Sequence, residues 1–239
     1  MFASKKVCIC SQSSLNSIPR LISYLFKNKI QAVVNGFDNY RMDKVEKEIT
    51  STTHFDKKSK IKMVYIGAMN NTKNQIALLE VLKEMRMEGE LIFLGDGQNK
   101  NFLSSFSEKV PGPIKIKFSG RVSRNTAIKH MFEADIFISL SKGEGLPIAV
   151  LEAMYAGCFL ILSKIPPHKE ISPPLKRCLF VKTANTNEIV QALEYVEDNI
   201  EMLKGNRIVS KEYAINKFSL NSMLVNYLKI YNSFLALKV

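Results

Sequence analysis

Two glutamates lie eight positions apart in residues 141–157, whose sequence is SKGEGLPIAVLEAMYAG. Glu144 follows an apolar run, and Glu152 lies in the helix predicted after it. A helical side chain leans toward the N-terminus of its helix, so both carboxylates can meet one ligand there. Carboxylates accept hydrogen bonds from sugar or ribose hydroxyls, and the exposed amides of Gly145 and Leu146 suit a phosphate. The pattern therefore indicates a site for a hydroxylated, phosphorylated ligand.

A purely structural interpretation of the same residues stays open. In it, Glu144 caps the helix and Glu152 is a solvated helical residue. Ser141 is open in the same way, as a donor to a nucleotide or as a structural hydroxyl. Asp96 lies between two glycines, where a turn-forming role is favoured over a catalytic one.

The three histidines and Glu170 are weaker candidates. We expect His54 to be a surface residue in a polar stretch and His130 to be a partly buried helical residue. His168 and Glu170 lie in residues 164–171, which we predict to be a loop on the ligand side of the fold. Each of them either contacts a sugar or serves only the loop.

Short apolar runs alternate with helical patterns from residue 60 onward. Strands are predicted at 62–67, 90–97, 114–120, 135–141, 158–163 and 179–183, and helices at 74–87, 99–108, 126–134, 147–157 and 186–204. Continuous apolar strands in strict alternation with helices are typical of a parallel sheet covered on both faces. We therefore predict an α/β fold, a doubly wound, Rossmann-like parallel sheet.

Ligands bind beyond the carboxyl ends of the strands in such a sheet. The loops to examine are therefore 67–74, 95–99, 119–124, 141–147 and 164–171. Residues 1–60 follow the alternation less well, with a strand-like VCIC, a predicted helix at 17–27 and a polar stretch at 43–60. That stretch is interpreted as a linker or a solvent-exposed helix. Residues 211–236 show one long amphipathic helical pattern.

The chain carries a formal net charge of +12, and the excess lies mainly near its two ends. Such a surface attracts anionic lipid or phosphorylated ligands, or it reflects a lysine-rich composition with solvated faces. No nucleic-acid-binding motif is present, so we expect no nucleic-acid partner. No apolar run reaches the about 18 residues of a membrane span, and the N-terminus lacks a signal core. We expect a cytoplasmic protein, with peripheral association with the inner face of the membrane as an open option.

The segment E-G-L-P-x-x-x-L-E-A-M-x-A-G resembles the E-x7-E motif of retaining glycosyltransferases of the group-one class, often numbered family four. Other segments are similar to that family in order and spacing, over about residues 30–235. They are YIGAMNNTKNQIALLEVL at 65–82, FLGDGQNKNFL at 93–103, IKFSGRVSRNTAIKHMFEADIFISLSKGEGLP at 116–147 and SKIPPHKEI at 163–171. The resemblance implies a GT-B fold, in which two Rossmann-like domains face each other across a cleft. This chain would be the C-terminal, donor-binding domain.

The resemblance also implies roles for individual residues. Glu144 would face the donor sugar, Glu152 would hold the ribose hydroxyls and Lys73 would bind the diphosphate. The substrate would be a nucleotide sugar, expected to be UDP-linked, with no cofactor and no metal. Two backbone segments would contact the rest of the donor. The first would lie along the base, and the second would bring helix amides to the sugar and the phosphate. These are Gly120, Arg121 and Val122, followed by Gly145, Leu146 and Pro147.

Two departures from the family pattern stand out. Ala68 occupies the position, five residues before Lys73, where the family usually has an arginine. Arg121 is a candidate substitute for that cation. The second departure is that KKVCICSQSSLNSI resembles the last strand and turn of the family's first domain, and QAVVNGFDNYRM resembles its interdomain segment. The acceptor-binding first domain would therefore be almost entirely missing.

This comparison implies three parts. Residues 1–60 would be a remnant of the acceptor domain with the interdomain linker, 61–210 the nucleotide-sugar-binding domain and 211–239 a C-terminal helix. In the family that helix packs across the first domain. Here Phe218, Tyr227 and Tyr231 would be exposed unless a partner chain covers them.

The leading hypothesis is sugar transfer from a nucleotide sugar to a glycan or lipid-linked acceptor, with retention, in the synthesis of surface polysaccharide such as capsule or lipopolysaccharide. A separate chain that supplies the acceptor domain would complete the enzyme. The alternative is a non-catalytic nucleotide-sugar-binding module or a truncated, inactive transferase, which Ala68 and the missing domain favour.

Overall fold

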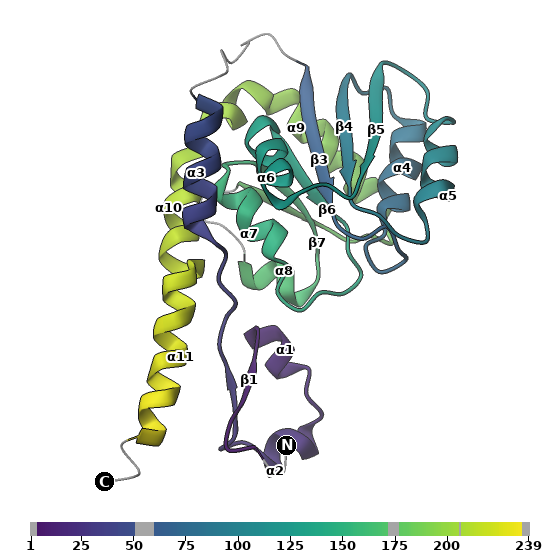
Figure 1. Ribbon diagram of the computed structural model, residues 1–239. Helices are drawn as coiled ribbons and strands as arrows, with labels where there is room; N and C mark the ends of the chain where they lie inside the picture. The colour runs from purple at the N-terminus through teal and green to yellow at the C-terminus, as the bar shows by residue number, and fades with distance from the viewer. Residues whose placement is uncertain (1–3, 51–59, 172–176, 206, 236–239) are drawn as a thin grey trace.

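A computed structural model describes residues 4–50, 60–171, 177–205 and 207–235. Over these ranges a six-stranded parallel sheet lies between two layers of helices, and a narrower part projects from this body (Figure 1). The N-terminal segment and the last helix form the projecting part. The predicted α/β fold is confirmed.

The sheet has the strand order β5-β4-β3-β6-β7-β8, and every pair is parallel. The chain starts at the centre, runs to one edge, returns to the centre and then runs to the other edge, which is doubly wound topology. The direction reverses between β3 and β6, so the loops after these two strands lie together. The strands are β3 (Ile61–Ile66), β4 (Gly89–Leu94), β5 (Ile114–Gly120), β6 (Ile136–Ser139), β7 (Phe159–Ser163) and β8 (Cys178–Val181).

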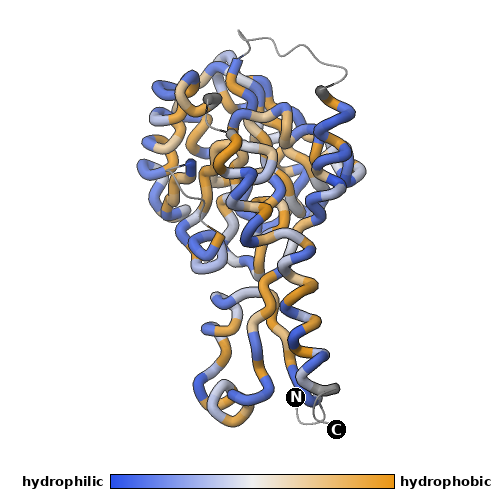
Figure 2. Tube along the Cα trace, turned by 90° about the vertical axis from the view of Figure 1, so that its left-hand side faces the viewer, coloured by the Kyte–Doolittle hydropathy of each residue, from blue (hydrophilic) through white to orange (hydrophobic). Residues whose placement is uncertain are grey.

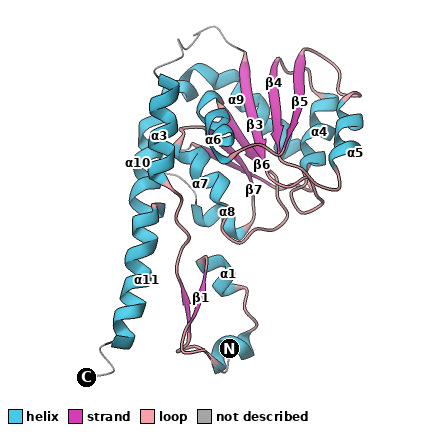
Figure 3. Ribbon diagram, in the orientation of Figure 1, coloured by secondary structure: helices cyan, strands magenta, loops and turns pink. Residues whose placement is uncertain are grey.

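Two helical layers cover the sheet because its strands are apolar on both faces (Figure 3). Neighbouring residues of β3 enter different cores: Val64 packs into one and Met63 and Tyr65 into the other. One layer contains α4 (Gln75–Glu84), α5 (Lys100–Ser107) and α9 (Thr186–Gly205). The other contains α3 (Asn39–Thr50), α6 (Arg124–Glu133), α7 (Ile148–Tyr155) and α10 (Arg207–Phe218).

Two local predictions are wrong. Residues 164–171 are not a loop, because α8 (Pro166–Ile171) forms there, with a proline at its first position. Residues 43–50 of the polar stretch at 43–60 belong to α3, so the helix alternative is correct there, but the helix is not solvent-exposed all round. Val45 and Ile49 of that helix are buried in the core beside the sheet.

The predicted single helix at 211–236 is two helices, α10 and α11 (Leu220–Leu235). Phe37, in the segment just before α3, separates them. Its N–H donates to Phe218 O at 2.9 Å, and its O accepts from Leu220 N at 3.0 Å. Gly36 makes this approach possible, because a Cβ there would lie 2.6 Å from the Ser219 carbonyl oxygen. The sequence pattern does not show this break, since it comes from a segment more than 180 residues away.

The N-terminal segment contains a parallel pair, β1 (Val7–Ile9) and β2 (Ile30–Ala32), with α1 (Gln12–Asn16) and α2 (Arg20–Leu25) between them. It lies beside α11, and hydrophobic and hydrophilic residues alternate along both (Figure 2). Tyr231 of α11 is exposed, as predicted, whereas the prediction is wrong for Phe218, which is buried. No helix within the described residues is both long and apolar enough to cross a membrane.

Candidate functional site

The loops after β3 and β6 bring Lys73 and Glu144 together at the point where the sheet reverses direction. Lys73 Nζ lies 2.5 Å from Glu144 Oε1, and the Glu144 side chain is only 10% exposed. Glu144 does not cap α7, because the N-cap of that helix is Pro147 and no side chain bonds to it there. The capping alternative for Glu144 is therefore wrong.

Tyr65 fixes the two loops to each other. Its hydroxyl donates to the carbonyl oxygen of Lys73 and accepts from Leu140 N at 2.8 Å. Burial raises the pKa of the Tyr65 phenol well above its usual value, so the hydroxyl keeps its proton and continues to donate. A second link is the bond from Lys142 N to Thr72 O at 2.8 Å. The backbone beneath the ion pair is thus set by bonds between the loops.

The Gly-Asp-Gly turn after β4 is needed for close packing against the loop after β3. Gly95 has φ +138°, and a Cβ on it would lie 2.0 Å from Gly67 O. Asp96 accepts from Gly97 N at 2.8 Å and pairs with Lys100. The hydrogen bond from the Gly97 amide lowers the pKa of the Asp96 carboxyl, and Lys100 lowers it further. Asp96 forms the turn, in agreement with the interpretation from sequence.

Glu152 is 3% exposed and forms an ion pair with Arg124, whose side chain is 49% exposed. Burial raises the pKa of the Glu152 carboxyl above its usual value, and Arg124 opposes that shift. The alternative in which Glu152 is a solvated helical residue is therefore wrong. Arg124 was not among the residues predicted from sequence, since the family resemblance implied roles only for Gly120, Arg121 and Val122 in this region. The available signal was its place directly after Ser123, which caps α6.

The remaining donor-side residues divide by exposure. Gly145 and Arg121 are exposed, Val122 is partly buried, and Gly120, Leu146 and Pro147 are buried. The charge of Arg121 acts on Asp96, so the two side chains lie near each other. Ser141 is fully buried, with its Oγ 3.3 Å from Ser139 Oγ, so its hydroxyl lies in the interior. This arrangement favours the structural role for Ser141.

His168 and Glu170 do not face open solvent beyond the strand ends. His168 is fully buried on α8, with Nδ1 2.9 Å from Ser163 Oγ, and burial lowers its pKa. Glu170 accepts from Gln12 N and Ser13 N at 2.8 Å each, so both carboxylate oxygens bind the start of α1. The structural role is favoured for both.

The other two histidines and the cysteines add no further site. His130 is partly buried beside Glu133, as expected, and His54 lies outside the described residues. Cys8, Cys10, Cys158 and Cys178 form no disulfide bond within the described residues. Across the described ranges, no three His, Cys, Asp or Glu side chains gather in a way that would hold a metal ion.

The N-terminal segment also reaches the loop of the two glutamates. Ser11 Oγ donates to Gly145 O at 3.1 Å, and a Cβ on Gly145 would lie 3.3 Å from Cys10 Sγ. With the Glu170 contacts, these bonds place α1 against the loop that carries Glu144. The N-terminal segment and the loop after β6 therefore lie on the same side of the site.

Known proteins resemble both the sequence and the fold. A family model described as "Glycosyl transferases group 1" matches residues 46–209. The capsular polysaccharide biosynthesis glycosyltransferase CapH of Staphylococcus aureus is 32% identical over 164 residues, which are 65% of this chain and 42% of CapH. An uncharacterized 41.2 kDa protein in the cps region of Klebsiella pneumoniae is 22% identical over 98% of this chain and 63% of its own length.

Two solved structures show the same fold at low sequence identity. A glycosyltransferase from Rickettsia africae has a TM-score of 0.73 and 21% identity, covering 97% of this chain and 64% of that one. HepE of Anabaena, solved in complex with UDP and glucose, has a TM-score of 0.74 and 13% identity, covering 96% of this chain and 63% of HepE.

This chain spans less than two thirds of the length of each of these proteins. The family model nevertheless matches well over half of the chain, and the matched range includes Lys73, Glu144 and Glu152. The sheet order and the solved structures agree with a GT-B type of α/β domain. The chain therefore belongs to the group 1 glycosyl transferase family.

Proposed function

We propose that this chain is the donor-binding part of a retaining glycosyltransferase that uses a UDP-linked sugar to build a surface polysaccharide. The observation that carries the proposal is the Lys73–Glu144 pair at the reversal point of the sheet, 2.5 Å between Nζ and Oε1. Ligands of doubly wound sheets bind at this point. Support for the donor comes from HepE, which was solved with UDP, and support for the pathway comes from the name of CapH.

In this proposal a nucleoside diphosphate separates the ion pair. The phosphate oxygens take Lys73 as their partner, which releases the Glu144 carboxylate for hydroxyls of the donor sugar. The start of α7, at Pro147, presents backbone N–H groups and the positive end of the helix dipole to the same phosphates. Together these groups stabilise the charge on the leaving diphosphate, without a metal or a cofactor. The acceptor hydroxyl attacks from the face that the leaving group vacates.

Glu152 and the segment from Gly120 to Val122 complete the donor site in the same proposal. Glu152 binds the ribose hydroxyls after its partner Arg124 moves or shares the carboxylate. The backbone of the 120–122 segment lies along the base. Arg121 stands in for the cation that Ala68 does not supply, and its exposure leaves it free to turn toward the phosphates.

The acceptor side belongs to the proposal as well. Residues 1–60 would be the end of an acceptor domain with its linker, 61–210 the donor domain and 211–239 the C-terminal helix. A separate chain with the acceptor domain is the proposed partner, and the exposed apolar residues of α11, Leu224, Leu228 and Tyr231, are the proposed contact. We place the protein in the cytoplasm, with the basic charge holding it against the anionic inner face of the membrane.

Calorimetric titration of the purified chain with UDP, GDP and their sugar conjugates tests the donor site. Binding of UDP that Glu152→Ala weakens, with circular dichroism showing that the variant is still folded, supports the proposal. If correctly folded protein binds no nucleotide, the donor-site proposal fails for this chain.

A non-catalytic nucleotide-sugar-binding module is the second candidate, and Ala68 in place of a cationic side chain favours it. The two candidates differ in turnover. A transferase slowly hydrolyses its UDP-sugar in the absence of acceptor and loses that activity in Glu144→Gln. A binding module binds the UDP-sugar and leaves it intact.

A further inference from the structure

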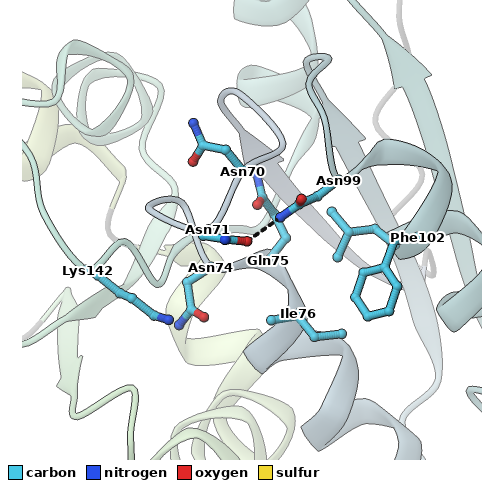
Figure 4. A pocket seen from close by; sticks show the side chains of 9 residues that line it. Asn70, Asn71, Asn74, Gln75, Ile76, Asn99, Phe102 and Lys142 are labelled. Carbon is cyan, nitrogen blue, oxygen red and sulfur yellow. Dashed lines mark hydrogen bonds between the residues drawn. The ribbon is translucent and has the colours of Figure 1, made fainter.

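A cavity lies between the β3–α4 turn and the N-terminal end of α5. Its volume is about 150 Å³, and five of its nine lining residues carry side-chain amides (Figure 4). The donor site described above uses none of these side chains. The amide groups belong to Asn70, Asn71, Asn74, Gln75 and Asn99.

Gln75 has an unused hydrogen-bond acceptor in the wall of this cavity. The side chain is 2% exposed, and its Nε2 donates to Ala68 O at 2.9 Å. Its Oε1 has no hydrogen-bond partner among the described residues. A buried acceptor without a donor costs free energy, so a ligand that brings a hydroxyl to this oxygen gains more than an ordinary hydrogen bond. Figure 4 places Gln75 between Asn70 and Asn99.

The other lining side chains narrow the chemistry of that ligand. Among the described residues that line the cavity none is acidic and only Lys142 is charged, so the lining offers a cationic ligand no carboxylate. Phe102 is 57% exposed and offers an aromatic face. Amides donate and accept at neighbouring atoms, as ring hydroxyls do, and the C–H face of a sugar packs against an aromatic ring.

We propose that this cavity is a saccharide subsite that holds one acidic hexopyranose ring of the glycan chain. The volume is below the about 300 Å³ at which pockets for larger ligands begin, so one ring fits and a nucleotide sugar does not. Lys142 pairs with the ring carboxylate. The choice of a glycan ligand rests on the proposed function, although the cavity and the free Gln75 oxygen do not.

The subsite shares its walls with the turn that holds Lys73. Asn70 Oδ1 accepts from Lys73 N at 2.9 Å, and Asn74 Nδ2 donates to Leu140 O at 3.2 Å. A ring held by Asn70 and Asn74 therefore contacts the same β3–α4 turn that carries Lys73 of the Lys73–Glu144 pair. In this position the subsite keeps a growing glycan close to the donor site between transfers.

The test is a titration of the ¹⁵N-labelled chain with methyl glucuronopyranoside, followed by the side-chain amide signals of Gln75 and Asn99. Both signals shift on binding. Phe102→Ala weakens binding by at least about fivefold, because the stacking face is lost. Met202→Ala, an equally exposed residue on α9, leaves the affinity unchanged. Methyl glucopyranoside binds more weakly than the acidic glycoside, and Lys142→Ala removes that difference.

Three results would overturn the proposal. The first is that neither glycoside shifts the Gln75 and Asn99 signals. The second is that Phe102→Ala binds as tightly as the unaltered chain. The third is binding of free glucuronate but not of its methyl glycoside, since the ligand would then be a sugar released from a hydrolysed donor and not a glycan residue. A parallel titration with UDP keeps the result separate from a failure of the donor site.

Discussion

Arg124 and Glu152 form an ion pair between the start of α6 and the middle of α7 in which only the arginine reaches solvent. Glu152 is 3% exposed, and half-exposed Arg124 favours its charge more than the other cation nearby, Arg41. The pair also joins the base-side loop after β5 to the helix that follows the Glu144 loop. It is therefore a sensitive point for both stability and donor binding.

Removing Arg124 should destabilise the fold most near neutral pH. Arg124→Ala leaves a buried charge without its partner, and because Arg124 is half-exposed we expect a loss of about 1–2 kcal/mol. Burial already raises the pKa of Glu152 above its ordinary 4.5, so folded protein binds this proton more tightly than unfolded protein. The contribution of Glu152 to stability therefore falls as pH rises above that value, and it falls more steeply in the variant.

Urea unfolding of both proteins at several pH values measures this effect. The difference in unfolding free energy should shrink as pH falls toward 4.5. Arg124→Ala/Glu152→Gln is the control, because it removes the charge that needs a partner, and its stability should vary less with pH. A loss in Arg124→Ala that is the same at all pH values would contradict the ion-pair explanation.

Lys73→Met should weaken UDP binding by about tenfold to a hundredfold, the range expected when one charge-assisted contact is lost. Uridine has no phosphate, so its affinity should change little. Calorimetric titration with both ligands separates the two effects. Lys83→Ala, an exposed lysine on α4, serves as the matched control. Equal losses for UDP and uridine would show that Lys73 acts on the fold of the site and not on the diphosphate.

Gly95→Ala should destabilise the protein by about 2–4 kcal/mol. The new Cβ would lie 2.0 Å from Gly67 O, in a backbone conformation that favours glycine. Gly143→Ala is the matched control, since nothing lies within 4 Å of a Cβ there and its φ is ordinary. Thermal unfolding of both variants provides the comparison, and similar melting temperatures would contradict the packing argument.

Glu170→Ala should loosen the N-terminal segment from the Glu144 loop. The amides of Gln12 and Ser13 lose a charged acceptor at 2.8 Å, so their hydrogen exchange should accelerate by about tenfold or more. Exchange measured by NMR or mass spectrometry detects the change, and strand amides of β6 give the internal reference. Glu197→Ala, an exposed glutamate of α9, should leave both amides unchanged. Unchanged exchange in Glu170→Ala would mean that other contacts hold α1.

Much of the central fold could be predicted from sequence because its signals are local. Continuous apolar runs indicate buried parallel strands, and the Pro147 to Gly157 boundaries mark a helix, so β5 and α7 lie close to their predicted ranges. The spacing of Glu144 and Glu152 predicted one shared ligand, which stays a prediction, since each forms its own ion pair in the structure. The break at Ser219 and the helix α8 were missed, because Phe37 and local proline geometry decide them.

The sequence by itself determined the types and order of the residues at the site, since the strand and helix periods put them on successive loops. Only the tertiary structure decided their partners: Glu144 with Lys73, and Glu152 with Arg124. These pairs join residues on elements that are far apart in the chain, and local periodicity holds no information about them. The burial of His168 and the hydrogen bonds from the start of α1 to Glu170 depend on the same long-range packing. Charge pairing across neighbouring loops is set by how the sheet reverses direction, which no local pattern encodes.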